Sequence, residues 1–256
     1  MHPSAYDLKS FYMTRSGRVV RRILNQHIQD LWPDTKGLRV LGCGYAVPYL
    51  MPFKDRCERS VAVMPAIGGA HHWPNAKGDK NLVCLSEQSA LPFETNSIDR
   101  ILMIHDLEYR EWLEPNFQEL WRVLKSSGRL LVVVPNRAGL WARADWSPFG
   151  QGRPFSASQI CSALKDNRFI HERTQEALFV PPFRAQTILK MAGLFERLGQ
   201  GGVPLPAGVH IVEAGKQLYA RADKGRGAAV PVRGRGMLLP KPAIRQISSR
   251  TRSGEI

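Results

Sequence analysis

The chain has 256 residues, of which 43% are hydrophobic and 23% are charged, and its formal net charge is +14. This apolar content suffices for a sizeable globular core, while no apolar run approaches the ~18 residues of a membrane span. The start of the chain also lacks the basic and then apolar pattern of a signal peptide, so a cytoplasmic location is expected.

Part of the positive charge is concentrated near the C-terminus. Residues 223–256 hold eight Lys or Arg against two acids and are interrupted by glycine and proline. Such a composition predicts a basic, disordered tail that follows a domain over residues 1–222. Within the tail, Arg233-Gly234-Arg235-Gly236 resembles a short piece of an RNA-binding segment, and a solvated basic tail is the alternative interpretation.

Short, almost continuously apolar runs alternate with helical patterns along the chain. Residues 19–31 predict an amphipathic helix that packs against a sheet edge. Apolar runs predict strands at 38–44, 60–64, 81–85, 100–105, 129–134 and 209–219. Helices are expected at 117–125, after Ser156, which has capping-box spacing to Gln159, and at 185–198. This alternation predicts an α/β fold with a doubly wound, mostly parallel sheet.

The first of these strands runs into the glycine turn Gly42-Cys43-Gly44, which precedes a predicted helix. Glycine turns in this position present backbone N–H groups to nucleotide-like ligands, although glycines also form ordinary tight turns. No C-x-x-C pair occurs among Cys43, Cys57, Cys84 and Cys161, so neither a metal site nor a disulfide framework is expected.

Four segments together carry a resemblance to a known family. They are the glycine turn, residues 87–93 (EQSALPF), residues 96–100 (NSIDR) and residues 120–129 (LWRVLKSSGR). In this order and spacing they resemble class I S-adenosylmethionine-dependent methyltransferases of the type 11 branch, which includes quinone-biosynthesis enzymes. The resemblance is best over residues 38–135. It implies a Rossmann-like sheet with an antiparallel last strand.

The resemblance also assigns expected roles to individual residues. It implies S-adenosyl-L-methionine as the cofactor, with binding residues Gly42, Cys43, Gly44, Met64, Glu87 and Gln88. Glu87 would accept a hydrogen bond from the adenine amino group. The catalytic candidates are His105 and Asp106, because ligands in such sheets lie beyond the carboxyl ends of the strands.

Three positions depart from the family pattern. Val40 stands where an acid is usual, Ala46 replaces a glycine, and Met64 replaces the acid that normally binds the ribose hydroxyls. Loss of a charge-assisted hydrogen bond costs about 1.5–3 kcal/mol, so weakened cofactor binding is expected.

Other polar and aromatic residues have two interpretations each. His71-His72-Trp73 would be ligands or exposed loop residues. His105, Asp106, Glu108 and Tyr109 would perform acid–base chemistry or cap a loop. The segment 137–153, with Trp141, Trp146, Phe149, Arg137, Arg143 and Arg153, would form a lid over an acceptor or a surface loop pinned by a buried tryptophan.

The sequence therefore favours a methyltransferase that acts on a small-molecule or lipid-soluble acceptor. Amino-methylation of DNA is disfavoured, because His105-Asp106-Leu107-Glu108 replaces the Asn-Pro-Pro-Tyr type motif. The alternatives are an inactive methyltransferase-fold protein that binds a partner, and an RNA-directed enzyme or binder that uses the basic tail. The identity of the acceptor and the oligomeric state do not follow from the sequence.

Overall fold

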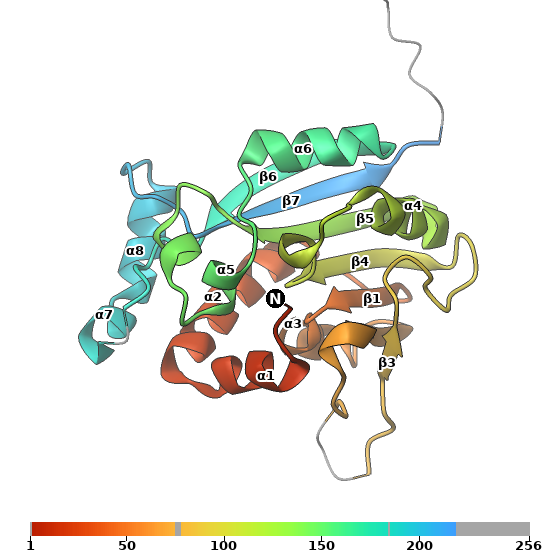
Figure 1. Ribbon diagram of the computed structural model, residues 1–256, viewed down its shortest axis with the longest axis horizontal. Coiled ribbons are helices and arrows are strands. Elements are labelled where there is room, and N and C mark those ends of the chain that lie inside the picture. The colour runs from red at the N-terminus through yellow and green to blue at the C-terminus, as the bar shows by residue number, and fades with distance from the viewer. Residues whose placement is uncertain (1, 75–77, 184, 219–256) are drawn as a thin grey trace, which may run out of the picture. The chain divides into compact units, whose positions relative to one another are not determined.

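A computed structural model describes residues 2–74, 78–183 and 185–218 (Figure 1). Its centre is a seven-stranded sheet with the strand order β3-β2-β1-β4-β5-β7-β6. The strands are β1 (Arg39–Gly44), β2 (Arg59–Pro65), β3 (Val83–Ser86), β4 (Ile98–Ile104), β5 (Leu124–Pro135), β6 (Phe169–Ala177) and β7 (Val209–Lys216). The predicted doubly wound α/β sheet is therefore confirmed.

The strands β1 to β5 are parallel, and β7 runs antiparallel between β5 and β6. The expected antiparallel last strand is thus present. The strand β6 has no counterpart among the sequence predictions. Its residues are polar and mostly exposed, because β6 forms the sheet edge beside β7 alone. A strand of this kind lacks the apolar run that marks a buried strand.

Helices cover both faces of the sheet. They are α1 (Ala5–Met13), α2 (Arg15–Leu31), α3 (Val47–Leu50), α4 (Glu114–Val123), α5 (Pro148–Gln151), α6 (Ala157–Asp166), α7 (Gln186–Lys190) and α8 (Ala192–Gln200). Four short 3-10 helices complete them: η1 (Met51–Phe53), η2 (Ala66–Gly68), η3 (Leu107–Tyr109) and η4 (Leu140–Arg143).

The two faces of the sheet build two separate apolar clusters. On one face Leu102 and Leu131 pack with residues of α1, α2 and α3. On the other face Ile101 and Leu130 pack with α4 and α6. Neighbouring residues along a strand point to opposite faces, which explains why the buried runs 101–104 of β4 and 130–135 of β5 are continuously apolar. In Figure 1, α4 and α6 lie on one side of the sheet and α2 and α3 on the other.

The helix predictions are largely confirmed. The helix α2 contacts the edge strand β6 through a hydrogen bond between His27 and Gln175 (3.2 Å). Ser156 and Gln159 form the predicted capping box of α6. The single helix expected over 185–198 is wrong, since the structure has α7 and α8 with a break at Met191. Gly193 has low helix propensity, which favours an interruption here.

The helix α1 was not among the sequence predictions. It begins with a capping box in which Ser4 and Asp7 exchange hydrogen bonds. The predicted tail over 223–256 lies outside the described residues. Within the described part of the chain, none of the helices has the length and apolar character that crossing a bilayer requires.

Candidate functional site

The glycine turn at the end of β1 packs closely against neighbouring elements. A Cβ atom at Gly42 would lie 2.7 Å from Leu50 Cδ1 and 2.8 Å from Ala46 Cβ, so Gly42 lets the turn and α3 pack directly on the strand. Gly44 has a φ of +74°, a conformation that L side chains rarely adopt, and a Cβ there would lie 2.3 Å from the Ile104 carbonyl oxygen. Both glycines are therefore required by the close approach of protein groups.

Three tyrosines cover this turn. The Tyr12 and Tyr45 rings stack with centroids 5.9 Å apart. The Tyr49 hydroxyl donates to the Tyr12 hydroxyl (2.8 Å), and the Tyr45 hydroxyl hydrogen-bonds His71 Nε2 (3.0 Å). All three rings are buried, and burial raises the pKa of each phenol. The predicted ligand position thus has a wall of protonated phenols.

The catalytic candidate His105 follows β4 and belongs to a buried hydrogen-bonded chain. Its Nε2 lies 2.7 Å from the Tyr12 hydroxyl, and its Nδ1 lies 3.2 Å from Glu108 Oε1. The Tyr12 hydroxyl already accepts from Tyr49, so its own proton is donated to Nε2, and the proton of the neutral ring lies on Nδ1, which faces Glu108. His105 also has a φ of +54°, a strained conformation that often occurs at functional sites.

Asp106 is fully buried beside this chain. Its Oδ1 accepts from Arg110 (2.7 Å), whereas its Oδ2 has no hydrogen-bond partner among the described residues. Burial raises the pKa of the Asp106 carboxyl, although Arg110 opposes this effect. The adjacent Cys43 thiol also has a raised pKa, again through burial. A buried carboxyl oxygen without a partner is costly, so Oδ2 is a candidate ligand contact.

The end of β2 is apolar. Met64 is 1% exposed and belongs to the core cluster that contains α1, α2 and α3. Val40 and Ala46 belong to the same cluster. The three departures from the family pattern are therefore packed into the core, and each apolar side chain has apolar neighbours.

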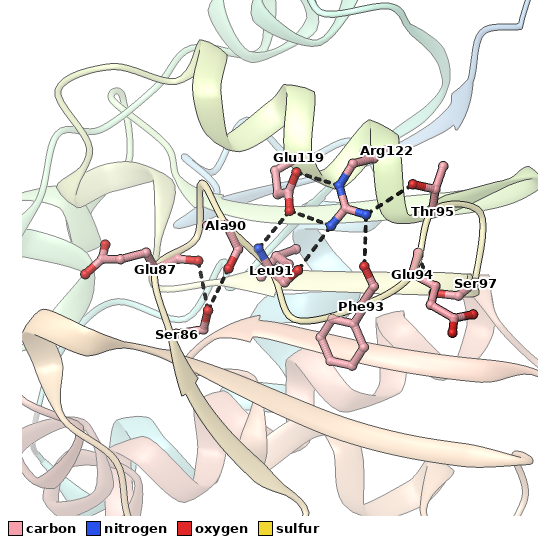
Figure 2. Close-up of polar contacts among 10 residues, drawn as sticks. All are labelled: Ser86, Glu87, Ala90, Leu91, Phe93, Glu94, Thr95, Ser97, Glu119 and Arg122. Carbon is pink, nitrogen blue, oxygen red and sulfur yellow. Dashed lines mark hydrogen bonds and ion pairs between the residues drawn. The ribbon is translucent and has the colours of Figure 1, made fainter.

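Glu87 and Gln88 lie in the loop between β3 and β4, which α4 holds in place. Arg122 of α4 donates to the carbonyls of Leu91 (3.1 Å) and Phe93 (2.9 Å), and Glu119 accepts from the Leu91 N–H (2.8 Å). Figure 2 shows this arrangement, with Arg122 and Glu119 also paired with each other.

The two candidate residues of this loop have different environments. Glu87 is exposed, whereas Gln88 is fully buried. Gln88 Nε2 donates weakly to the Val63 carbonyl (3.5 Å), and Gln88 Oε1 has no partner among the described residues. Gln88 therefore places a hydrogen-bond acceptor, its Oε1 atom, beside the end of β2. Met64 stands there in place of the usual acidic residue.

The remaining candidates divide between core and surface. His71 is buried and His72 is exposed, so the two histidines do not form one ligand pair. In the segment 137–153, Trp141 is buried and donates from Nε1 to the Val180 carbonyl (2.7 Å). Its three arginines are exposed: Arg137, Arg143 and Arg153. This segment fits the interpretation of a loop pinned by a buried tryptophan.

Sequence reasoning missed Tyr12 as a neighbour of the site. Tyr12 lies 93 residues before His105 in the chain, and its helix α1 has no strong helical pattern in the sequence. The only local signal was the Ser4 and Asp7 capping pair.

Comparisons with known proteins agree with this geometry. Residues 40–132 match the family model described as methyltransferase domain. No protein of known, curated function matches the sequence significantly. Among solved structures, the YcgJ protein from Bacillus subtilis has a TM-score of 0.53 and 16% identity, and the alignment covers 77% of this chain and 98% of that chain.

Two further solved structures are similar. A possible histamine N-methyltransferase from Thermotoga maritima has a TM-score of 0.54 and 16% identity, with 82% of this chain and 93% of that chain covered. A geranyl diphosphate C-methyltransferase from Streptomyces coelicolor, crystallised with Mg²⁺, geranyl diphosphate and S-adenosyl-L-homocysteine, has a TM-score of 0.52 and 14% identity, with coverages of 75% and 79%.

The matched segment and the strand order define a class I S-adenosylmethionine-dependent methyltransferase fold. The resemblance predicted from the sequence motifs is confirmed, and the matched segment lies within the predicted core at 38–135.

Proposed function

We propose that this protein binds S-adenosyl-L-methionine and transfers its methyl group to a small-molecule or lipid-soluble acceptor. The proposal is supported by the methyltransferase-domain match over residues 40–132 and by the fold that it shares with solved methyltransferases. The observation that carries it further is a pair of buried oxygens that have no hydrogen-bond partner among the described residues and follow β3 and β4, two strands separated in the sheet by β2 and β1.

These oxygens are Gln88 Oε1, after β3, and Asp106 Oδ2, after β4. The cofactor offers N–H donors at two separate places, its adenine amino group and its α-ammonium group. Gln88 and exposed Glu87 fit the first, and Asp106 fits the second, because an amide or carboxylate oxygen accepts from N–H. Each bond would satisfy a group that is otherwise left unsatisfied on burial, so the residues present fit this cofactor.

The remaining candidate contacts come from the turn between β1 and α3. Backbone groups of Gly42, Cys43 and Gly44 would line the methionyl part, whereas Met64, which the resemblance places at the ribose, is packed in the apolar core cluster. The sulfonium of the cofactor supplies an electrophilic methyl group, so the protein mainly aligns the acceptor and excludes water. For an acceptor that loses a proton, the Tyr12 hydroxyl takes that proton and passes its own to His105 Nε2, while Glu108 lies at the other ring nitrogen and stabilises the imidazolium that results.

A second candidate function is ligand or partner binding without catalysis. It is favoured by Met64, whose thioether replaces the usual ribose acceptor within an apolar cluster. The third possibility, an RNA-directed function, depends on the basic tail, which lies outside the described residues.

Calorimetric titration of S-adenosylmethionine and S-adenosylhomocysteine into the full chain tests the proposal. We expect both to bind, and we expect Gln88→Met to weaken binding by about 0.5–1.5 kcal/mol, roughly two- to tenfold. The matched control is Gln118→Met, which changes an exposed glutamine on α4. Absence of binding to the parent protein would reject the proposal and favour the second candidate.

Transfer itself is tested with methyl-labelled S-adenosylmethionine. The parent protein is expected to move label into extracts that contain small molecules or lipids. Binding without transfer to any extract would again favour a protein that retains the ligand but does not catalyse.

A further inference from the structure

The segment between β6 and β7 exposes an unusual number of large apolar side chains. Five of them are between 40% and 54% exposed. They form what we call the α7–α8 apolar surface, which consists of Phe183, Met191, Leu194, Leu198 and Val203. Isolated exposed apolar residues are normal in proteins, but several within one short segment indicate an interaction site.

The arrangement of α8 explains why these side chains face outward. Its inner side carries Ala192, Glu196 and Gly199, of which the first two are buried. A Cβ at Gly199 would lie 2.2 Å from the Phe179 ring, so this glycine lets α8 pack closely on the chain after β6. Met191, Leu194 and Leu198 recur at intervals of three and four residues. They therefore share a different side of the helix.

The exposed charged side chains of α7 and α8 themselves are both basic. Lys190 lies four residues before Leu194, and Arg197 lies three residues after it, so both flank the apolar side chains. Arg15 reaches the same region, where its Nη1 donates to Gln186 Oε1 of α7 (3.2 Å).

The single acidic side chain in the described part of α7 and α8 is turned inward. Glu196 is buried and accepts from the N–H groups of Leu178 (3.2 Å) and Phe179 (2.7 Å). The Glu196 carboxylate is thus paired with backbone N–H groups inside the protein and does not face the solvent. The exposed residues of α7 and α8 are apolar, basic or uncharged polar, and none of them is acidic.

The position of this surface relates it to the candidate site. Ala177 at the end of β6 and Pro135 at the end of β5 both pair with Val209, the first residue of β7. The α7–α8 segment therefore projects from the edge of the sheet at which the parallel strands end. Figure 1 shows α7 and α8 on the side where β7 begins. Ligands of doubly wound sheets bind at this same edge.

We propose that the α7–α8 apolar surface docks on an anionic lipid surface and so delivers the candidate site to a lipid-soluble acceptor. This inference rests on the proposed function for the choice of acceptor. The pairing of exposed apolar side chains with Lys190, Arg197 and Arg15 is the pattern of a helix that lies in a membrane interface. A second copy of this chain, which would bring the same positive charges, is a less suitable occupant.

Vesicle co-sedimentation of the full chain tests the docking surface. The probes are phosphatidylcholine vesicles with and without phosphatidylglycerol. We expect binding to the anionic vesicles and loss of that binding in the triple variant Met191→Gln, Leu194→Gln, Leu198→Gln. Each of Lys190→Glu and Arg197→Glu is expected to weaken binding by about fivefold or more, since a basic residue near an anionic surface contributes about 1 kcal/mol.

The control variant is Met51→Gln with Ile170→Gln, which changes two exposed apolar residues outside the segment. It should bind vesicles as the parent does. The proposal is overturned if the parent does not bind, if the triple variant binds equally well, or if the parent is a dimer that the triple variant dissociates. Equal binding would assign the attraction to the basic tail.

The calorimetric titration separates this inference from the proposed function. The triple variant is expected to bind S-adenosylhomocysteine as tightly as the parent, because the changed residues lie away from Gln88 and Asp106. Vesicle binding by a chain that binds no S-adenosylhomocysteine would keep the docking surface and reject the methyltransferase function.

Discussion

At the scale of single residues, the glycine turn shows that a glycine can be required for packing within the protein as well as for the approach of a ligand. Gly42 has Leu50 and Ala46 directly above its Cα. We expect Gly42→Ala to destabilise the protein by about 1–3 kcal/mol, because an added methyl group overpacks this contact. Thermal unfolding of the parent and the variant measures the loss.

A second glycine provides the matched comparison. Gly193 lies in α8, and a Cβ there would meet nothing within 4 Å. Gly193→Ala should stabilise the protein by about 0.4–1 kcal/mol, because alanine has the higher helix propensity and restricts the unfolded chain. Equal changes in both variants would contradict the packing that is described for Gly42.

Substitution of Met64 tests whether an acidic residue at the end of β2 can bind the ribose hydroxyls, as it does in the family. The sequence alone suggests that Met64→Asp would restore a ribose acceptor. The structure places Met64 in an apolar cluster, where an ionised carboxylate has no partner. We therefore expect Met64→Asp to lose at least about 2 kcal/mol of stability and to gain no affinity for S-adenosylhomocysteine. Met64→Leu, which conserves volume, should lose less than about 1.5 kcal/mol.

At the scale of elements, one hydroxyl joins α1 to the end of β4. Tyr12→Phe removes the hydrogen bond to His105 and the one from Tyr49, so buried polar atoms lose their partners. The expected cost is about 1–3 kcal/mol. Amide hydrogen exchange in α1 should accelerate in this variant. Tyr6→Phe, at an exposed position on the same helix, should leave exchange unchanged.

A histidine joins three other elements and introduces a pH dependence. His27 of α2 contacts Gln175 of β6 and Gln200 of α8, with Glu196 and Asp30 as its acidic neighbours. Glu196, whose Oε2 lies 3.9 Å from His27 Nε2, raises the pKa of His27 above its ordinary value of 6.5. Its stabilising effect is therefore complete below pH 6.5 and declines as pH rises through the raised pKa.

Urea unfolding across this pH range measures the effect. The stability difference between the parent and His27→Gln should be largest below pH 6.5 and should shrink above it. A difference that grows with pH would show that His27 is held in its neutral form instead.

The elements that the sequence predicted share strong local signals. The strands β1, β2, β4 and β5 are buried on both faces toward their carboxyl ends, so each of them contains a continuous run of residues without polar side chains. The edge strand β6 and the helix α1 depend on tertiary contacts for their stability, and their sequences show no comparable pattern. Likewise, the position of Gln88 beside β2 could be anticipated from its loop, whereas the contact between Tyr12 and His105 required the folded chain.

At the scale of the whole molecule, the sheet is complete by residue 216, where β7 ends. Residues 223–256 contain few large apolar side chains to offset the entropy of ordering. Truncation after Ala222 should therefore change neither the melting temperature nor the affinity for S-adenosylhomocysteine. A loss of several degrees would show that the tail contributes to the stability of the domain.

The place of β7 in the strand order has a consequence for biosynthesis. Among the strands that the structure describes, β7 is the last to leave the ribosome, and it is inserted between two strands that were made earlier, β5 and β6. Until β7 emerges, β5 has an unpaired edge and β6 has no neighbour in the sheet. The central sheet therefore cannot close during translation of its first six strands, and the nascent chain retains unpaired backbone groups until residues 209–216 have been synthesised.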